Sequence, residues 1–267
     1  MELKGKKTVI TGCTSGIGLE LLKLLLVNDC TVVACARSID RLELPAGIPT
    51  DKLYKLKTDV SDKDELDALF TFAAEKLGSI DLFIANAGFA YYEKIAGPDW
   101  EHIEKIYKTN VMSFIYCAEK MKALHGDAPY NFVVTGSSMG FLSMPGYSLY
   151  SGTKAAVRGF ADAYRLELAP GQHFQVVYPI ATKTKFFSNA GSDTPVPWPT
   201  QSSETVARKI VNGIKRDKKH IYPSATFRIM SIVNRVLPFL FKIYVAINNK
   251  AYQKWLATQP AKAEGDK

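Results

Sequence analysis

The chain has 267 residues, of which 47% are hydrophobic and 22% are charged, and its formal net charge is +8 at pH 7. This composition suits one large α/β domain, because no linker, repeat or low-complexity tract divides the chain. The positive charge lies at one end, with 13 Lys and Arg against 4 Asp and Glu from Glu204 onward, which argues against a nucleic-acid partner.

Apolar runs rich in β-branched residues alternate with helical periods along the chain. Strands are expected at 7–11, 31–36, 54–58, 80–85, 131–135 and 174–178. Helices are expected along the apolar face from Ile17 to Leu25, from Ser61 to Gly78, and over 100–124 and 148–168. Strict alternation predicts a doubly wound parallel sheet with helices on both faces, which binds ligands at the carboxyl ends of its strands.

The first expected strand runs into the glycine-rich sequence Thr-Gly-Cys-Thr-Ser-Gly-Ile-Gly at 11–18. Positions without side chains allow the backbone to approach a pyrophosphate, and the N–H groups and dipole of the following helix favour an anion there. The alternative is a glycine-rich turn that binds no ligand. Its place after the first strand favours a dinucleotide site.

The end of the second expected strand indicates which nucleotide is bound. An acidic residue there would accept hydrogen bonds from a ribose 2′-hydroxyl, but the sequence has Ala36 and Arg37. A guanidinium suits a 2′-phosphate, which a carboxylate would repel. Arg37 predicts NADP(H), against the alternative that it is a solvated surface charge.

Tyr150 and Lys154 are four residues apart and share one face of an expected helix. A nearby cation favours a phenolate, which would give an acid or base usable near neutral pH. Ser137 lies at the end of a strand, where its hydroxyl can hydrogen-bond a substrate oxygen, and Ser138 is the local competitor for this role.

These motifs occur in an order that resembles the short-chain dehydrogenase/reductase family, over residues 5 to 222. The resemblance rests on the loop at 11–18, on Asn86-Ala87-Gly88, on Ser137 and on the Tyr-x-x-x-Lys pair. It implies a Rossmann-like fold and an oxidoreductase that uses a nicotinamide cofactor. Tyr150 is then similar to the family's general acid/base, Ser137 to its substrate-orienting hydroxyl and Lys154 to the residue that holds the nicotinamide ribose.

Further positions follow from the same resemblance. Asp59 and Val60 match the adenine-contacting pair, Asn110 matches the asparagine that holds a water for proton relay, and Pro179 and Thr184 match positions near the nicotinamide. The family usually has glycine where this chain has Ile180. The expected catalytic residues are Ser137, Tyr150, Lys154 and Asn110. The expected cofactor-binding residues are Gly12, Thr14, Ser15, Gly16, Ile17, Gly18, Arg37, Asp59, Val60, Asn86, Ala87, Gly88, Tyr150, Lys154, Pro179 and Thr184.

Aromatic and apolar residues lie near the expected substrate site. Phe186, Phe187 and Trp198 belong to the loop at 180–203, and Phe141, Met144 and Tyr147 lie between Ser137 and Tyr150. If they point inward they form an apolar pocket for a small to medium, lipophilic carbonyl or alcohol. The alternative is that half of them serve ordinary packing. The alternative functions are a nucleotide-sugar epimerase or dehydratase and a catalytically silent nucleotide sensor.

The chain ends in an apolar and basic segment, so we expect a catalytic domain at 1–223, a helical extension at 224–257 and a disordered tail at 258–267. In the extension, Arg228, Arg235 and Lys242 recur every seven residues among apolar side chains, and Pro238 should kink the helix. The charges interrupt each apolar run before the ~20 residues that a membrane span needs. The extension would lie in a membrane interface, or pack on a second subunit of a homodimer, or cover the substrate pocket.

The remaining composition predicts a cytoplasmic protein without a metal. Cys13, Cys30, Cys35 and Cys117 form no Cys-x-x-Cys pair and lie in or beside apolar segments, which is typical of buried free thiols in a reducing compartment. The four histidines are scattered without the spacing of metal ligands. The first five residues lack the apolar run of a signal peptide. We therefore expect a cytoplasmic protein, either free or attached peripherally to a membrane.

Overall fold

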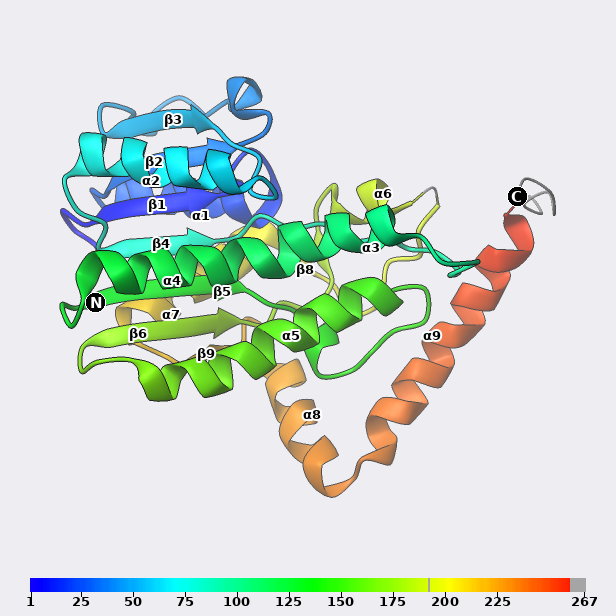
Figure 1. The fold of residues 1–267 in the computed structure, drawn as a ribbon. Helices are drawn as coiled ribbons and strands as arrows, with labels where there is room; N and C mark the ends of the chain where they lie inside the picture. The colour runs from blue at the N-terminus through cyan, green and yellow to red at the C-terminus, as the bar shows by residue number, and fades with distance from the viewer. Residues whose placement is uncertain (192, 260–267) are drawn as a thin grey trace.

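The structure is a computed structural model that describes residues 1–191 and 193–259. Within these residues the chain forms a seven-stranded parallel sheet of order β3-β2-β1-β4-β5-β6-β9 (Figure 1). The strands are β1 Lys7–Thr11, β2 Thr31–Ala36, β3 Leu53–Lys57, β4 Leu82–Ala85, β5 Tyr130–Thr135, β6 Gln172–Val177 and β9 His220–Ile221. The expected Rossmann-like α/β fold is confirmed, and the six expected strands are found with ends shifted by at most two residues.

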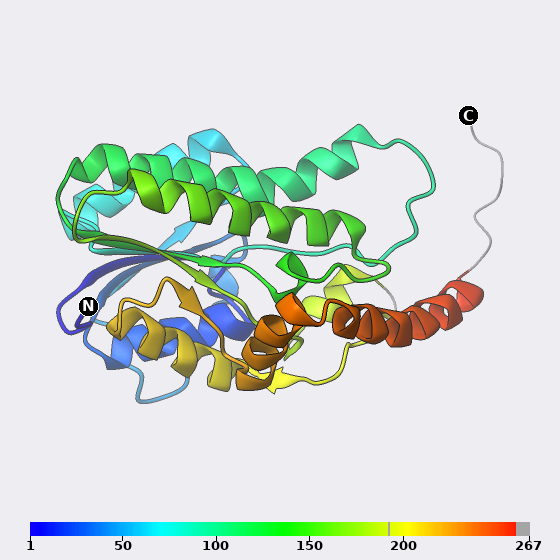
Figure 2. The ribbon, with the colours of Figure 1, turned by 90° about the horizontal axis from the view of Figure 1, so that it is seen from below.

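Helices cover both faces of the sheet (Figure 2). On one face lie α2 Lys63–Leu77, α4 Ser113–His125 and α5 Ser148–Tyr164, and on the other lie α1 Gly16–Val27 and α7 Ser203–Lys215. The central strands are buried on both sides and therefore read as continuous apolar runs in the sequence. The core is two apolar layers, one on each face of the sheet.

Four phenylalanines stack across the sheet on the α2 side. Phe83, Phe132 and Phe174 occupy matching positions of β4, β5 and β6, and their ring centroids are 5.2 and 5.1 Å apart. Phe70 of α2 stacks on Phe83 at 5.5 Å. The ladder fixes the register of the strands whose carboxyl ends carry the polar motifs.

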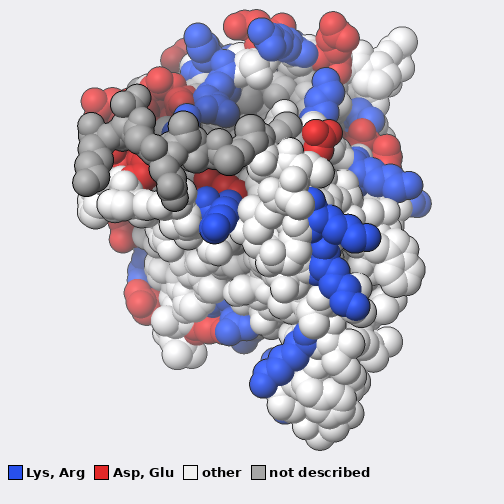
Figure 3. Space-filling view, turned by 90° about the vertical axis from the view of Figure 1, so that its right-hand side faces the viewer, with Lys and Arg blue, Asp and Glu red and all other residues white. Residues whose placement is uncertain are grey.

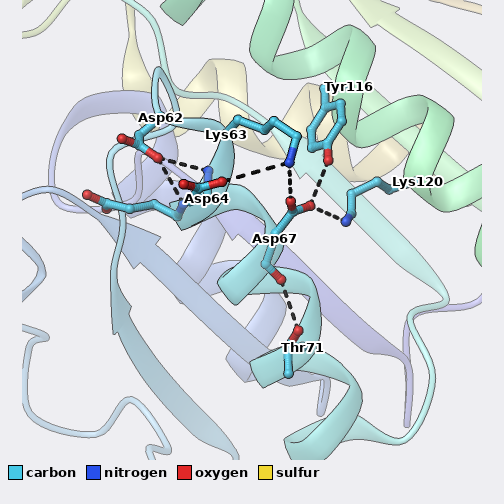
Figure 4. Close-up of polar contacts among 8 residues, drawn as sticks. Asp62, Lys63, Asp64, Asp67, Thr71, Tyr116 and Lys120 are labelled. Atoms are coloured by element: carbon cyan, nitrogen blue, oxygen red, sulfur yellow. Dashed lines mark hydrogen bonds and ion pairs between the residues drawn. The ribbon is translucent and has the colours of Figure 1, made fainter.

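The N-cap of helix α2 lies one residue later than the sequence suggested. Ser61 was expected to start it, but its hydroxyl donates to the Asp59 carboxylate, and Asp62 accepts the N–H groups of Asp64 and Glu65 instead. One turn further along, the Asp67 carboxylate accepts hydrogen bonds from Lys63 and from Tyr116 and Lys120 of α4 (Figure 4). These contacts hold α2 against α4.

The expected helix over 100–124 is interrupted. It consists of α3 Trp100–Tyr107, a π-helical turn at Lys108–Met112, and α4. The expected helix over 148–168 ends as α5 at Tyr164 and continues in a short 3₁₀ turn, Arg165–Glu167. The π turn places Asn110 on the inner side of the helix, where the side chain is buried.

Between β6 and α7 the chain forms β7 Thr182–Lys183, α6 Phe186–Ala190 and β8 Gln201–Ser202. After β9 it forms α8 Ala225–Val236 and α9 Phe239–Thr258, which diverge from the body as a V (Figure 1). We call residues 225–258 the C-terminal arm.

The bend of the arm is 120° and lies at Leu237 and Pro238, which confirms the expected kink. No single helix in the described ranges is long and apolar enough to cross a bilayer, although α8 and α9 together pass that test as a bent pair. Of the expected tail at 258–267, Thr258 is the last residue of α9, and residues 260–267 lie outside the described residues.

Candidate active site

A pocket of about 370 Å³ opens at the carboxyl ends of β1, β4 and β5. It lies where the strand order reverses between β1 and β4, the usual ligand position in doubly wound sheets. Every residue expected to bind the cofactor lines this pocket, and so does Ser137. Residues from distant parts of the chain, expected from motifs alone, therefore meet at one place.

The glycine-rich loop is shaped as a cradle. Gly12 and Gly16 have φ angles of +66° and +55°, in the region that favours glycine. A Cβ atom on Gly18 would lie 2.0 Å from the carbonyl oxygen of Gly12, so helix α1 begins against the loop backbone. Asn86 Nδ2 donates to the same carbonyl at 3.0 Å, and the Thr11 hydroxyl accepts the N–H groups that follow β4. The loop fits a pyrophosphate at the N-terminus of α1.

Arg37 directly follows β2 and also lines the pocket. Its Nη1 is 4.0 Å from Asp59 Oδ2, and its side chain is 68% exposed. Although burial raises the pKa of Asp59, hydrogen bonds from Ser61 and the charge of Arg37 bring it below its usual value. Asp59 is therefore held mainly by Ser61, and the long contact leaves the Arg37 guanidinium able to bind another anion.

Ser137, Tyr150 and Lys154 line the pocket and are almost completely buried. Tyr150 and Lys154 lie one turn apart on α5, and Lys154 Nζ is 5.5 Å from the centre of the Tyr150 ring. The ammonium donates to the backbone carbonyl of Thr135 at 2.8 Å. The Ser137 hydroxyl accepts the N–H of Met139 at 3.1 Å, which orients it at the end of β5.

Burial controls the protonation of the pair. It raises the pKa of Tyr150 to about 12, against the opposing effect of a hydrogen bond with Ser137, and it lowers the pKa of Lys154 to about 8. The expected lowering of the tyrosine pKa by Lys154 is therefore wrong for this arrangement. Desolvation outweighs the cation, and the ammonium is bound to the Thr135 carbonyl. A phenol that keeps its proton at neutral pH is suited to act as a proton donor.

Asn110 does not line the pocket. Its Nδ2 donates to the carbonyl oxygen of Phe89 at 2.8 Å and to Thr153 Oγ1 at 3.1 Å, and its Oδ1 accepts the N–H of Phe89 at 3.1 Å. The π turn thus ties the segment after Gly88 to α5. The expected role of Asn110 in holding a water stays a prediction.

Apolar side chains form the part of the pocket beside Tyr150. Phe186 and Phe187 line it as expected, and the Phe186 ring lies 5.5 Å from that of Tyr150. Phe89, Met139 and Ile180 join them. Motif reasoning missed Phe89 and Met139, although they directly follow Gly88 and Ser138 in the sequence.

Of the other expected pocket residues, three pack in the protein interior and one is exposed. Phe141 packs against Tyr178 and Phe227, Met144 and Tyr147 are buried in the core, and Trp198 is 79% exposed. These four do not line the pocket. The interpretation that about half of these residues serve ordinary packing is the correct one.

Comparison with known proteins gives consistent results. The family model described as short chain dehydrogenase matches residues 6–195. The chain is 29% identical over 274 residues to a 3-ketodihydrosphingosine reductase of Dictyostelium discoideum, covering 91% of this chain and 82% of the relative. It is 32% identical over 168 residues to the NADPH-dependent 1-acyldihydroxyacetone phosphate reductase of Saccharomyces cerevisiae, covering 62% and 57% of the two chains.

Solved structures agree on the fold. A short-chain dehydrogenase from Sphingobium yanoikuyae in complex with NADPH has a TM-score of 0.74 and 24% identity, and the match covers 97% of this chain and 98% of that one. A short chain dehydrogenase/reductase from Burkholderia phymatum in complex with NAD has a TM-score of 0.76 and 20% identity, covering 90% and 96%.

Proposed function

Because the chain belongs to the short-chain dehydrogenase/reductase family and is an NAD(P)-dependent oxidoreductase, we propose that it interconverts a carbonyl and an alcohol on a lipophilic substrate with NADP(H). One observation carries the proposal. Ser137, Tyr150 and Lys154 line the same pocket as the glycine-rich cradle, so a buried proton donor lies beside a nucleotide site.

A bound nicotinamide would supply the hydride in reduction and accept it in oxidation. In reduction, the Tyr150 hydroxyl donates its proton to the carbonyl oxygen as that oxygen gains the charge of an alkoxide. The Ser137 hydroxyl donates a hydrogen bond to the same oxygen and holds it in place. Lys154 places a positive charge next to the phenolate that remains, and this opposes part of the cost of burying that phenolate.

The exposed guanidinium of Arg37 supports NADP(H) over NAD(H). It lines the pocket after β2, and its only ion-pair contact in the described residues is the long one to Asp59. A 2′-phosphate would gain charge-assisted hydrogen bonds there. The yeast relative is named for its dependence on NADPH.

The apolar wall of the pocket supports the proposal of a lipophilic substrate, since it would stabilise hydrocarbon beside the reacting carbonyl. This wall includes Phe89, Met139, Phe186 and Phe187. The relatives with high coverage of this chain point the same way. One is named for 3-ketodihydrosphingosine, and another, 26% identical from Arabidopsis thaliana, is named an 11-beta-hydroxysteroid dehydrogenase.

The reaction is tested with purified protein, NADPH and a panel of ketones of increasing chain length, followed at the nicotinamide absorbance. Tyr150→Phe should lower kcat by at least about 10², the usual contribution of general acid catalysis, with NADPH affinity unchanged. Tyr147→Phe is the matched control, because this buried neighbour has no hydrogen-bond partner for its hydroxyl in the described structure and does not line the pocket. A Tyr150→Phe enzyme with more than about a tenth of wild-type turnover would contradict the assignment.

The cofactor is tested by fluorescence titration with NADPH and NADH. Ala36→Asp with Arg37→Ile should reverse the preference by about 10 to 100-fold, since one charge-assisted hydrogen-bonding partner is lost and a repulsive carboxylate is gained. Arg41→Ile, an exposed arginine outside the pocket, should leave the preference unchanged. Equal affinity of the wild type for both cofactors would remove the basis of the proposal.

A further inference from the structure

The C-terminal arm contacts the body with one side and exposes apolar residues on the other. Phe227 and Trp255 are buried, with ring centroids 5.8 Å from Phe141 and 4.6 Å from Tyr92. The exposed set has side chains between 41% and 79% exposed and consists of Ile229, Ile232, Val236, Leu237, Phe239, Ile243 and Ile247. Such a concentration on one short segment is unusual for a surface without a partner.

Helical spacing gathers these residues into stripes. Ile229, Ile232 and Val236 follow one side of α8 at intervals of three and four, and Phe239, Ile243 and Ile247 follow one side of α9 at intervals of four. The most exposed of them, Val236, is at the vertex of the V, next to Leu237 and Pro238. The vertex is therefore an apolar tip that projects from the body (Figure 1).

The charges of the arm all have one sign. From Ser224 to Gln259 there is no Asp or Glu. The cations are Arg228, Arg235, Lys242, Lys250 and Lys254, all exposed, and none forms an ion pair with the described residues. Seen from the arm side, Lys and Arg lie among otherwise uncharged atoms of the protruding part (Figure 3).

We propose that the arm docks on an anionic lipid bilayer, with the apolar stripes in the acyl boundary and the cations at the headgroups. Apolar stripes bordered only by cations suit such a surface. A second copy fits less well, because a two-fold contact would bring five cations against five others with no carboxylate between them. A nucleic acid would match the cations but leave the isoleucines without an apolar partner.

The arm is joined to the wall of the pocket. The Tyr244 hydroxyl donates to the carbonyl oxygen of Trp198 at 2.8 Å. Trp255 packs on Tyr92, whose backbone N–H donates to the Ala190 carbonyl of α6 at 2.9 Å. Because α6 carries Phe186 and Phe187, a docked arm holds the apolar side of the pocket close to the lipid.

Docking is measured by co-sedimentation of the full chain with phosphatidylcholine vesicles, with and without phosphatidylglycerol, at low and high salt. No cofactor or substrate is added, so the result does not depend on the proposed reaction. We expect binding that requires phosphatidylglycerol and weakens with salt. Absence of binding to phosphatidylglycerol vesicles at low salt would overturn the proposal.

Two double variants locate the contact. Arg235→Gln with Lys242→Gln should lower the partition coefficient about 25-fold, from about a fivefold effect for each cation near an anionic surface. Ile243→Gln with Ile247→Gln should lower it at least about tenfold. The matched controls are Arg208→Gln with Lys209→Gln on α7, and Leu166→Gln, whose side chain is 88% exposed. All these side chains are exposed, so melting temperatures should stay unchanged.

Other outcomes would contradict the proposal. If the arm variants bind vesicles as the wild type does, or if the α7 control loses as much binding, the contact lies elsewhere. If light scattering shows a salt-resistant dimer that the Ile243→Gln and Ile247→Gln pair dissociates, the stripe is covered by a second copy.

Discussion

Tyr150 and Lys154 are the residues whose chemistry depends most on their surroundings. Both are buried, and burial favours the neutral form of each: the pKa of the phenol rises to about 12, and that of the ammonium falls to about 8. The ammonium donates one hydrogen bond to the Thr135 carbonyl, but no carboxylate is bound to it in the described residues. The buried cation therefore lowers the free energy of unfolding at neutral pH, and destabilising groups of this kind are common at functional sites.

The cost of burying the Lys154 ammonium predicts how the stability of the protein changes with pH. Lys154 has a folded pKa of about 8 against an ordinary value of 10.5, so between these values the unfolded chain binds a proton that the folded chain does not. The free energy of unfolding should therefore rise through this window, by about 3 kcal/mol for this residue. Below about pH 8 the full penalty is present.

The measurement compares urea unfolding of wild type and Lys154→Met from pH 7 to 10.5. The variant should be more stable at pH 7, and the difference should shrink as the pH rises. The variant is compared with the wild type because the buried cysteines, whose pKa values are raised, lower the free energy of unfolding of both proteins as the pH rises. A difference that stays constant with pH would show that Lys154 is not desolvated.

At the scale of residues, the sequence identified which residues form the site better than it identified their partners and their burial. The motif residues converge on one pocket because the carboxyl ends of parallel strands share an edge. The partner of Lys154, however, is a backbone oxygen, and no residue type signals it. The direction of the Tyr150 pKa was missed for the same reason, since spacing shows a nearby cation but not the burial of both groups.

At the scale of elements, the π turn at Lys108–Met112 connects three parts of the site. Thr153 Oγ1 donates its proton to the Tyr150 carbonyl at 2.7 Å and so accepts from Asn110 Nδ2. The other amide proton of Asn110 goes to the Phe89 carbonyl. The Asn110 side chain thus faces two acceptors and one donor. A carboxamide, which has two N–H donors and one carbonyl acceptor, matches this set.

Asn110→Asp should therefore destabilise the protein by about 3 kcal/mol or more, because a carboxylate would be buried facing two acceptors. Thr109→Val, next to it in the π turn and partly exposed, is the matched control and should change the free energy of unfolding by less than about 1 kcal/mol. Chemical denaturation monitors both. If Asn110→Asp proved as stable as the wild type at neutral pH, the hydrogen-bonding assignment would be incorrect.

The elements found from the sequence are those with long, regular patterns. The strands buried on both faces gave apolar runs, whereas β7, β8 and β9 have two residues each and leave no period to detect. The π turn was missed because its apolar residues continue the helical pattern. The start of α2 was misplaced because Ser61 and Asp62 are both good capping residues, and the contact with Asp59 decides between them.

At the scale of the molecule, the compact body and the arm differ in how they are held. Helix α5 buries Tyr150, Ser151, Thr153, Lys154, Val157, Ala161 and Tyr164. In the arm, α8 buries only Phe227 and α9 only Trp255, among the described residues. The proposed boundary between residues 223 and 224 follows this change. The sequence indicated the kink and the charge of the arm, but its contacts with Tyr92 and Trp198 depend on tertiary structure.

The arm should open independently of the sheet, because local opening is governed by the buried contacts that must be lost. In hydrogen exchange of the lipid-free protein, amides of α8 and of the first half of α9 should exchange faster than those of α5 and β5. Trp255→Ala should speed exchange in α9 on the order of a hundredfold, from the packing lost against Tyr92, and leave β5 unchanged. Trp100→Ala is the matched control, since that indole is 74% exposed. Exchange in the arm as slow as in α5 would mean that arm and body unfold as one unit, and the boundary at 223 would then have no energetic meaning.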